Sequence, residues 1–218
     1  MTNEIYGIDY LRRRLADKQT RVLLRYKYYE MKNNAQDFSS LAPEKFKGLK
    51  EAVGWCAKAV DSLADRLQFD EFQNDEFDLS EIFLSNNQDI LIDSAVLSAL
   101  ISACSFVYIR EDNGYPRLQV IDGSNATGII DPVTNLLTEG YAVLERDSMG
   151  VVKTEAYFMA GMTEIYSHGV LVQRIPNAAP YALLVPIIYR PDAKRPFGHS
   201  RISRACIAYT QTALRTIK

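Results

Sequence analysis

The stretch Asn87–Arg110 constrains the fold of this chain more than any other, because its hydrophobic period changes halfway along. Apolar residues first recur at helical spacing, with small residues between them. The helical set is Ile90, Val96, Leu97, Leu100, Ile101 and Cys104. At Ser105 the pattern gives way to the aromatic and β-branched run Phe106–Ile109, which favours an extended strand. We therefore predict a helix that continues directly into a strand.

The segments on either side of this stretch differ in character, and together they predict an α+β fold. Residues 1–85 read as helices, 86–105 as the long helix, 106–190 as an antiparallel β module and 191–218 as a returning helix. The turn signals Asn113-Gly114 and Asp122-Gly123 separate short strands and favour a meander over a βαβ unit. The expected strands are 106–109, 117–121, 127–130, 141–145, 151–159, 162–166, 170–173 and 185–189.

Apolar periodicity predicts two helices in the N-terminal part. The first covers Asp9–Met31, and the second starts at Pro43 and carries an apolar seam as far as Leu67. The acid-rich segment Asp70–Glu81 lacks the glycine that a calcium loop needs for its sharp turn. We predict instead a connecting segment that tucks its aromatic side chains inward, and these are Phe69, Phe72 and Phe77.

The last helix is expected to begin at Ser200, which would cap it, and to present two faces. The apolar face comprises Ile202, Cys206, Tyr209, Ala213 and Ile217, and the basic face comprises Arg201, Arg204, Gln211, Arg215 and Lys218. We expect helices 87–105 and 200–218 to lie side by side, with Ala95, Ala99 and Ala103 accepting Ile202, Cys206 and Tyr209. Because the sequence ends inside this helix without a capping signal, we expect a longer protein.

The composition, the lengths of the apolar runs and the positions of the cysteines restrict the kinds of protein that this chain can be. A chain of 218 residues with 47% hydrophobic residues can fill one or two domains. No apolar run approaches the length of a membrane span, and Met1–Tyr10 has no apolar signal core. Cys56, Cys104 and Cys206 each fall on an apolar face of an expected helix, so buried free thiols in a reducing cytoplasm are favoured over disulfides.

The formal net charge is −2, but acidic and basic residues are concentrated in different segments of the chain. Residues 1–50 carry eleven Lys and Arg against six acids, and residues 151–218 carry nine against three. Residues 51–100 carry two against eleven, and residues 101–150 carry three against seven. These segments either neutralise one another within one fold or form complementary contacts between neighbouring copies of the chain.

Motifs that carry catalysis are absent from the sequence. It contains no phosphate-cradling glycine loop, no paired-cysteine metal site and no nucleophile elbow. His168 and His199 have no sequence-adjacent partner that would suggest a general base or a metal ligand. We therefore predict no catalytic activity, no metal and no cofactor. A small-molecule enzyme stays open as an alternative, because catalytic residues can assemble from distant positions.

Several short motifs, in order along the chain, resemble a known family. They are Tyr28-Tyr29, Val60-Asp61 with Arg66-Leu67, the passage Ala95–Ile109, Val120-Ile121-Asp122, Ile130-Asp131-Pro132 and Phe197–Ile202. In this order they resemble the portal protein of long-tailed double-stranded DNA bacteriophages. The resemblance implies that residues 1–85 belong to the wing, 86–105 and 191–218 to the stem helices and 106–190 to the clip.

The resemblance also implies a function and partners. A portal is a ring, usually a dodecamer, at one vertex of the phage head, and DNA is packaged and ejected through it. Its clip docks the large subunit of terminase and later a head-completion (adaptor) protein. The expected location is the virion, and the host cytoplasm during assembly, with no membrane contact and with double-stranded DNA bound non-specifically.

Two groups of residues follow as candidate sites. Arg201, Arg204, Arg215 and Lys218 would face the DNA channel or a neighbouring subunit. Asp147, Ser148, Met149 and His168, in turns of the β module, would contact a protein partner. The alternative of another class is a non-phage helical scaffold or adaptor that uses its β module to bind a protein.

Overall fold

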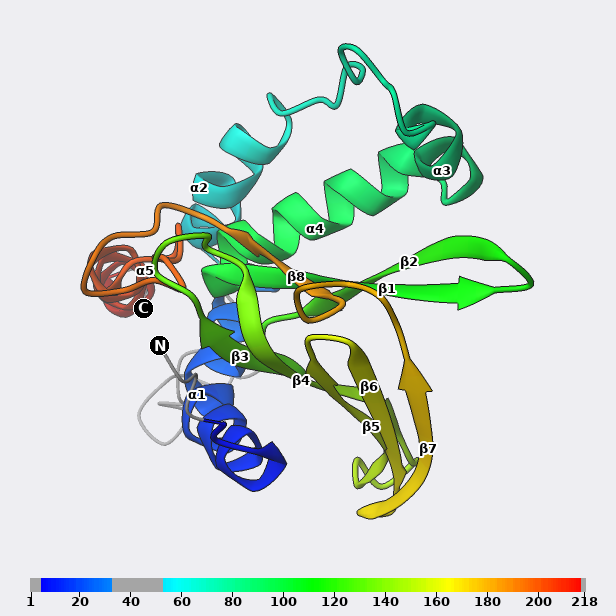
Figure 1. Cartoon of the computed structure of the whole chain (residues 1–218). Coiled ribbons are helices and arrows are strands. Elements are labelled where there is room, and N and C mark those ends of the chain that lie inside the picture. Colours follow the sequence, from blue (N-terminus) through cyan, green and yellow to red (C-terminus); the bar gives the residue numbers. More distant parts are fainter. Residues whose placement is uncertain (1–4, 33–52, 217–218) are drawn as a thin grey trace.

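The computed structural model describes residues 5–32 and 53–216, and it confirms the predicted α+β fold (Figure 1). The helices are α1 (Ile8–Tyr29), α2 (Trp55–Ala64), α3 (Leu79–Ser85), α4 (Gln88–Ser102) and α5 (Arg204–Thr216). The strands are β1 (Cys104–Asp112), β2 (Tyr115–Asp122), β3 (Ala126–Ile130), β4 (Leu137–Arg146), β5 (Val152–Met159), β6 (Met162–Ser167), β7 (Val170–Pro176) and β8 (Leu184–Ile188).

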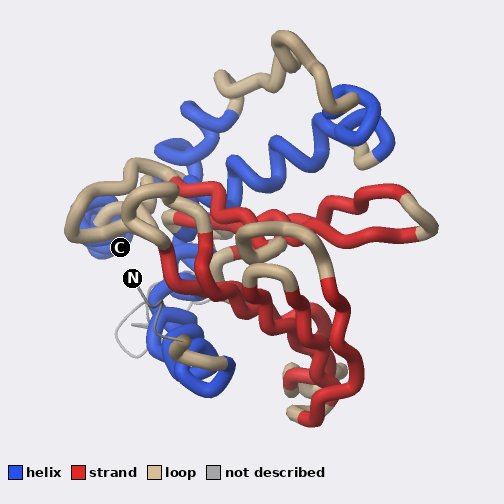
Figure 2. The backbone as a smooth tube through the Cα atoms, viewed as in Figure 1, coloured by secondary structure: helices blue, strands red, loops and turns tan. Residues whose placement is uncertain are grey.

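The strands of the antiparallel β module form two sheets, a division that the sequence did not indicate (Figure 2). One has the order β2-β1-β8 and the other is the meander β3-β4-β5-β6-β7. Asp112 pairs with Tyr115 across the two-residue turn Asn113-Gly114, so the predicted hairpin is confirmed. β8 returns antiparallel to β1, with Cys104 opposite Ile188. The β module therefore begins and ends on neighbouring strands.

The two sheets pack face to face through a core of aromatic and small residues. Phe106 and Tyr108 of β1 meet Phe158 of β5, and the Tyr108 and Phe158 rings lie edge to face at 5.0 Å. Leu184 of β8 is fully buried in the same cluster. Burial of these side chains holds the sheets together.

Helix α1 connects the β module to the other helices. Leu11 and Leu15, in its first half, pack on Tyr141, Val143 and Tyr157 of the five-stranded sheet. Near its other end, Tyr28 is buried among residues of α2 and α4. One helix thus contributes to two cores, which ties both parts of the molecule together.

Two buried glutamates fix the start of α1 on the sheet. The Glu139 carboxylate accepts the backbone N–H groups of Tyr6 (2.8 Å) and Gly7 (2.9 Å) and the Tyr157 hydroxyl. Gly7 is the N-cap residue of α1 and Tyr6 precedes it, so this carboxylate lies at the helix N-terminus, where an anion is favoured. The Glu155 carboxylate accepts from the Arg12 guanidinium and from the Tyr141 hydroxyl. Burial, followed by the nearby carboxylates, raises the pKa of Tyr141 and of Tyr157, so both hydroxyls stay protonated and donate.

The C-terminal end of α4 is where the helical and β parts join. A helix leaves its last carbonyl groups without partners, and here distant segments supply the donors. The contacts are Arg201 N–H to Leu100 O (2.8 Å), the Ser200 hydroxyl to Ile101 O (2.6 Å) and Arg25 Nη1 to Ser102 O (2.8 Å). Ala103 then turns the chain from helix to strand with a φ of 90°, and its carbonyl accepts the N–H of Tyr189.

Several predicted bounds in the helical part were wrong. The second helix ends at Ala64 rather than Leu67, and its expected start at Pro43 lies outside the described residues. A helix that we missed, α3, starts at the end of the acidic segment, and the Asp75 carboxylate accepts its first N–H groups. Phe69, Phe72 and Phe83 pack on one another, but Phe77 is 77% exposed and does not tuck inward.

Predictions about the long helix also need correction. It ends at Ser102, so Cys104 lies in β1, and Ile90 of the expected apolar face is 65% exposed. The first strand therefore starts two residues before Phe106, because Ala103 already breaks the helix. The other strands mostly extend one or more residues beyond their expected bounds; the largest difference is β4, which starts at Leu137 rather than Tyr141.

The last helix starts later than predicted and does not lie along α4. Its cap is Ser203, whose hydroxyl accepts the Cys206 N–H (3.1 Å), whereas Ser200 bonds the end of α4. Figure 1 looks nearly along the axis of α5 and across that of α4. Ile202 packs against Leu100 and Ile101 just ahead of the helix, but Tyr209 is 68% exposed. Thr210 and Leu214 occupy the buried face instead.

The close packing of the segment between β8 and α5 can be tested at Gly198. It has a φ of +74°, and a Cβ there would lie 2.2 Å from the Tyr189 carbonyl oxygen. Gly114 has a φ of +83° with nothing within 4 Å of its would-be Cβ, so it is a matched control. Gly198→Ala should lower the free energy of unfolding by roughly 2–4 kcal/mol and Gly114→Ala by about 1 kcal/mol, measured by urea denaturation. Equal losses at the two positions would contradict this packing.

Glu139 provides a test of the α1 attachment. Glu139→Gln replaces a carboxylate oxygen with an amide NH₂ that cannot accept, so the free energy of unfolding should fall by about 1–3 kcal/mol. Hydrogen exchange should also quicken in the first turns of α1. The control Glu145→Gln changes an exposed carboxylate that pairs with Lys153, and it should have little effect. Unchanged exchange in α1 would show that Glu139 does not hold the helix.

Candidate interaction surfaces

The predicted partner-binding turns lie at one end of the five-stranded sheet. The β4–β5 and β6–β7 hairpins both turn there, and the His168 N–H donates to the Lys153 carbonyl (2.9 Å). We call residues 147–151 and 168–170 the sheet tip (Figure 1, lower right). It brings Asp147, Ser148 and Met149 to the same end of the sheet as His168.

The sheet tip presents apolar side chains on an ordered turn. Met149 is 86% exposed, and Val151 and Val170 are also exposed. The Asp147 carboxylate accepts the N–H groups of Met149 and Val151, both at 2.9 Å, and so fixes the backbone that carries them. Exposed apolar side chains on a preordered loop cost little to immobilise, and they are suited to contact with a protein.

Charged groups lie beside these apolar side chains. Lys153 Nζ lies 2.6 Å from Glu145 Oε1, and this contact holds the pKa of the Glu145 carboxyl below its usual range. The His168 ring Nδ1 lies 3.2 Å from the Ser167 hydroxyl. The sheet tip thus has an apolar centre and a polar rim, the general arrangement of protein interfaces.

The predicted basic residues do not share one helical face. Arg201 precedes α5, and its Nε donates to the Ala59 carbonyl of α2 (3.0 Å). Arg204 and Arg215 are exposed, and their spacing of eleven residues places both on one side of α5. Lys218 lies outside the described residues. Arg201 is exposed as well, but its guanidinium is bonded to α2, so only Arg204 and Arg215 of the described residues in this group lie on α5.

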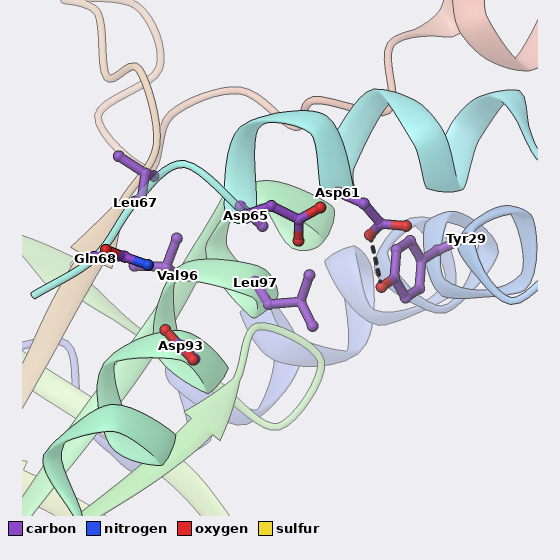
Figure 3. Close-up of a pocket in the computed structure, with 9 residues that line it drawn as sticks. Tyr29, Asp61, Asp65, Leu67, Gln68, Asp93, Val96 and Leu97 are labelled. Atoms are coloured by element: carbon purple, nitrogen blue, oxygen red, sulfur yellow. Dashed lines mark hydrogen bonds between the residues drawn. The ribbon is translucent and has the colours of Figure 1, made fainter.

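An acidic pocket of about 430 Å³ lies between α1, α2 and α4 (Figure 3). Asp61, Asp65 and Asp93 line it together with apolar side chains, which include Leu67, Val96 and Leu97. The Tyr29 hydroxyl donates to Asp61 Oδ1 (3.0 Å). Burial and then the Asp61 carboxylate raise the pKa of Tyr29 to about 12. The charge count indicated an acidic middle segment, but not this pocket, because its walls come from three separate helices and the segment that follows α2.

Groups suited to catalysis or metal binding are sparse. Within residues 5–32 and 53–216, no three His, Cys, Asp or Glu side chains gather closely enough to hold a metal ion. His199 pairs with Asp192 (2.5 Å) and Arg195 (3.2 Å) in the exposed loop before α5. Sequence reasoning missed this pair, whose only signal was a histidine seven residues after an aspartate.

No helix in the described part of the chain is long and apolar enough to cross a membrane.

Comparison with known proteins adds no assignment, since no family model matches the chain and no curated protein matches it.

Proposed function

We propose that this chain belongs to a portal protein of a tailed double-stranded DNA bacteriophage, a ring component at the junction of head and tail. The observation that best supports this proposal is the way in which the β module is inserted. The chain leaves the helices through α4 and β1, and it returns through β8, the antiparallel neighbour of β1, to the end of α4. A clip inserted between two stem helices requires this adjacency of its two connections.

The surfaces fit different partners under this proposal. The sheet tip would dock the large subunit of terminase during packaging and a head-completion protein afterwards. Arg204 and Arg215 would lie near the DNA channel or against an acidic surface of a neighbouring copy, such as the pocket of Asp61, Asp65 and Asp93. DNA must slide through a portal, so its contacts would be electrostatic and independent of sequence.

The proposed role is structural, and the protein would act in the virion after assembly in the host cytoplasm. A non-phage scaffold or adaptor is the second candidate, because the exposed apolar side chains of the sheet tip would serve any protein partner. A terminase gene beside the gene for this chain would favour the portal over the adaptor.

The sheet tip gives a direct test. Met149→Glu with Val151→Glu places charge on the apolar centre and should weaken binding of the cognate large terminase subunit roughly tenfold or more, measured by surface plasmon resonance. The matched control is Val133→Glu, which alters an equally exposed residue in the β3–β4 turn at the opposite end of the sheet. Binding that is weakened equally by the control, or by neither variant, would rule out the sheet tip as the docking surface.

A further inference from the structure

Two cysteines far apart in the sequence meet between α2 and α5. Cys56 Sγ and Cys206 Sγ lie 3.2 Å apart although 150 residues separate them. Cys56 is fully buried and Cys206 is half-buried. Cys104 is buried in the other core, between the sheets, and so it serves as an internal control.

We propose that Cys56 and Cys206 form a disulfide under oxidising conditions and that this bond locks α5 onto α2. A disulfide needs the sulfur atoms at about 2.05 Å, so they must approach by roughly 1.2 Å from their present contact. The bond would close a loop of about 150 residues and restrict the unfolded chain strongly. The pair exists whether or not the chain is part of a portal.

The chemistry requires a two-electron oxidant, and a hydroperoxide is the class that we propose. The Cys206 thiolate attacks the peroxide O–O bond, which gives a sulfenic acid on Cys206 and releases water or an alcohol. The Cys56 sulfur then attacks the Cys206 sulfur, the S–S bond forms, and the sulfenic hydroxyl leaves as water together with the Cys56 proton. Both thiols are oxidised, and the peroxide is reduced.

Exposure decides which cysteine reacts first. Cys206 is the only one of the two that solvent reaches, so it meets the oxidant, while Cys56 is already in contact and resolves the intermediate. Burial, followed by the neighbouring Cys56, raises the pKa of Cys206 to about 11. Little thiolate is therefore present near neutral pH, and the pair stays reduced until oxidant exposure is prolonged or the pH rises.

The bond would act on the helix that carries Arg204 and Arg215. Without it, α5 is held by buried Thr210 and Leu214 and by a hydrogen bond from Gln211 Nε2 to the Tyr28 hydroxyl. A covalent link one turn before Thr210 would fix α5 against α2 and reduce local opening of the helix.

The experiment treats the reduced protein with hydrogen peroxide and maps its peptides by mass spectrometry without reduction. We expect an intramolecular Cys56–Cys206 cross-link, with a rate that rises roughly tenfold per pH unit between about pH 7 and about pH 9. The oxidised protein should melt several degrees higher than the reduced protein, and dithiothreitol should reverse the shift. Cys104→Ala should retain both effects, and Cys206→Ser should lose both.

Three results would overturn the proposal, and each can be read on the wild-type protein, so none depends on whether a variant folds. The first is that both thiols remain reduced after prolonged peroxide at about pH 9. The second is oxidation only to sulfinic acid or to links between molecules. The third is a Cys56–Cys206 bond that leaves the melting temperature unchanged or lowers it, which would show strain rather than a lock.

Discussion

The last carbonyl groups of α4 have no partners within the helix, and the rest of the structure depends on supplying them. A helix that runs directly into a strand cannot use its own next turn to satisfy them. Donors come instead from α1, through Arg25, and from the returning segment, through Ser200 and Arg201. Ala103 adds a φ of 90°, a conformation that costs roughly 1–2 kcal/mol outside glycine. The segments packed around this junction stabilise that strained turn.

The same junction explains how the β module is oriented. β1 leaves the end of α4, β8 pairs beside it, and Tyr189 donates its N–H to Ala103 as the chain returns. The second sheet packs on β1 and β8 through Phe106, Leu184 and their neighbours. The sheet tip is therefore held at a fixed position relative to α4 through two sheets, without a flexible linker. A surface that binds protein partners benefits from being carried on a rigid sheet in this way.

Local patterns in the sequence predicted the elements whose causes are local. The change of period near Ser105 predicted the helix-to-strand passage, and Asn113-Gly114 predicted its hairpin. Features that depend on distant residues were missed or misplaced. The attachment of α1 through Glu139 and the contact between Cys56 and Cys206 join segments more than a hundred residues apart. The division into two sheets depends on the pairing of Cys104 with Ile188, at opposite ends of the β module. The prediction that Arg201 shares a helical face with Arg204 and Arg215 was wrong for a related reason. Ser200 resembled a helix cap, but its hydroxyl donates to the Ile101 carbonyl of α4. The helix therefore starts later, and Arg201 lies outside α5.

We propose that this chain is a subunit of a ring and that its β module lies at one end of that ring. Single-particle electron microscopy of the purified protein is the most direct test of this proposal. We expect closed rings with a central hole, with the β module at one end of the ring. Monomers, compact dimers or solid particles without a channel, under conditions in which the protein is folded, would contradict it.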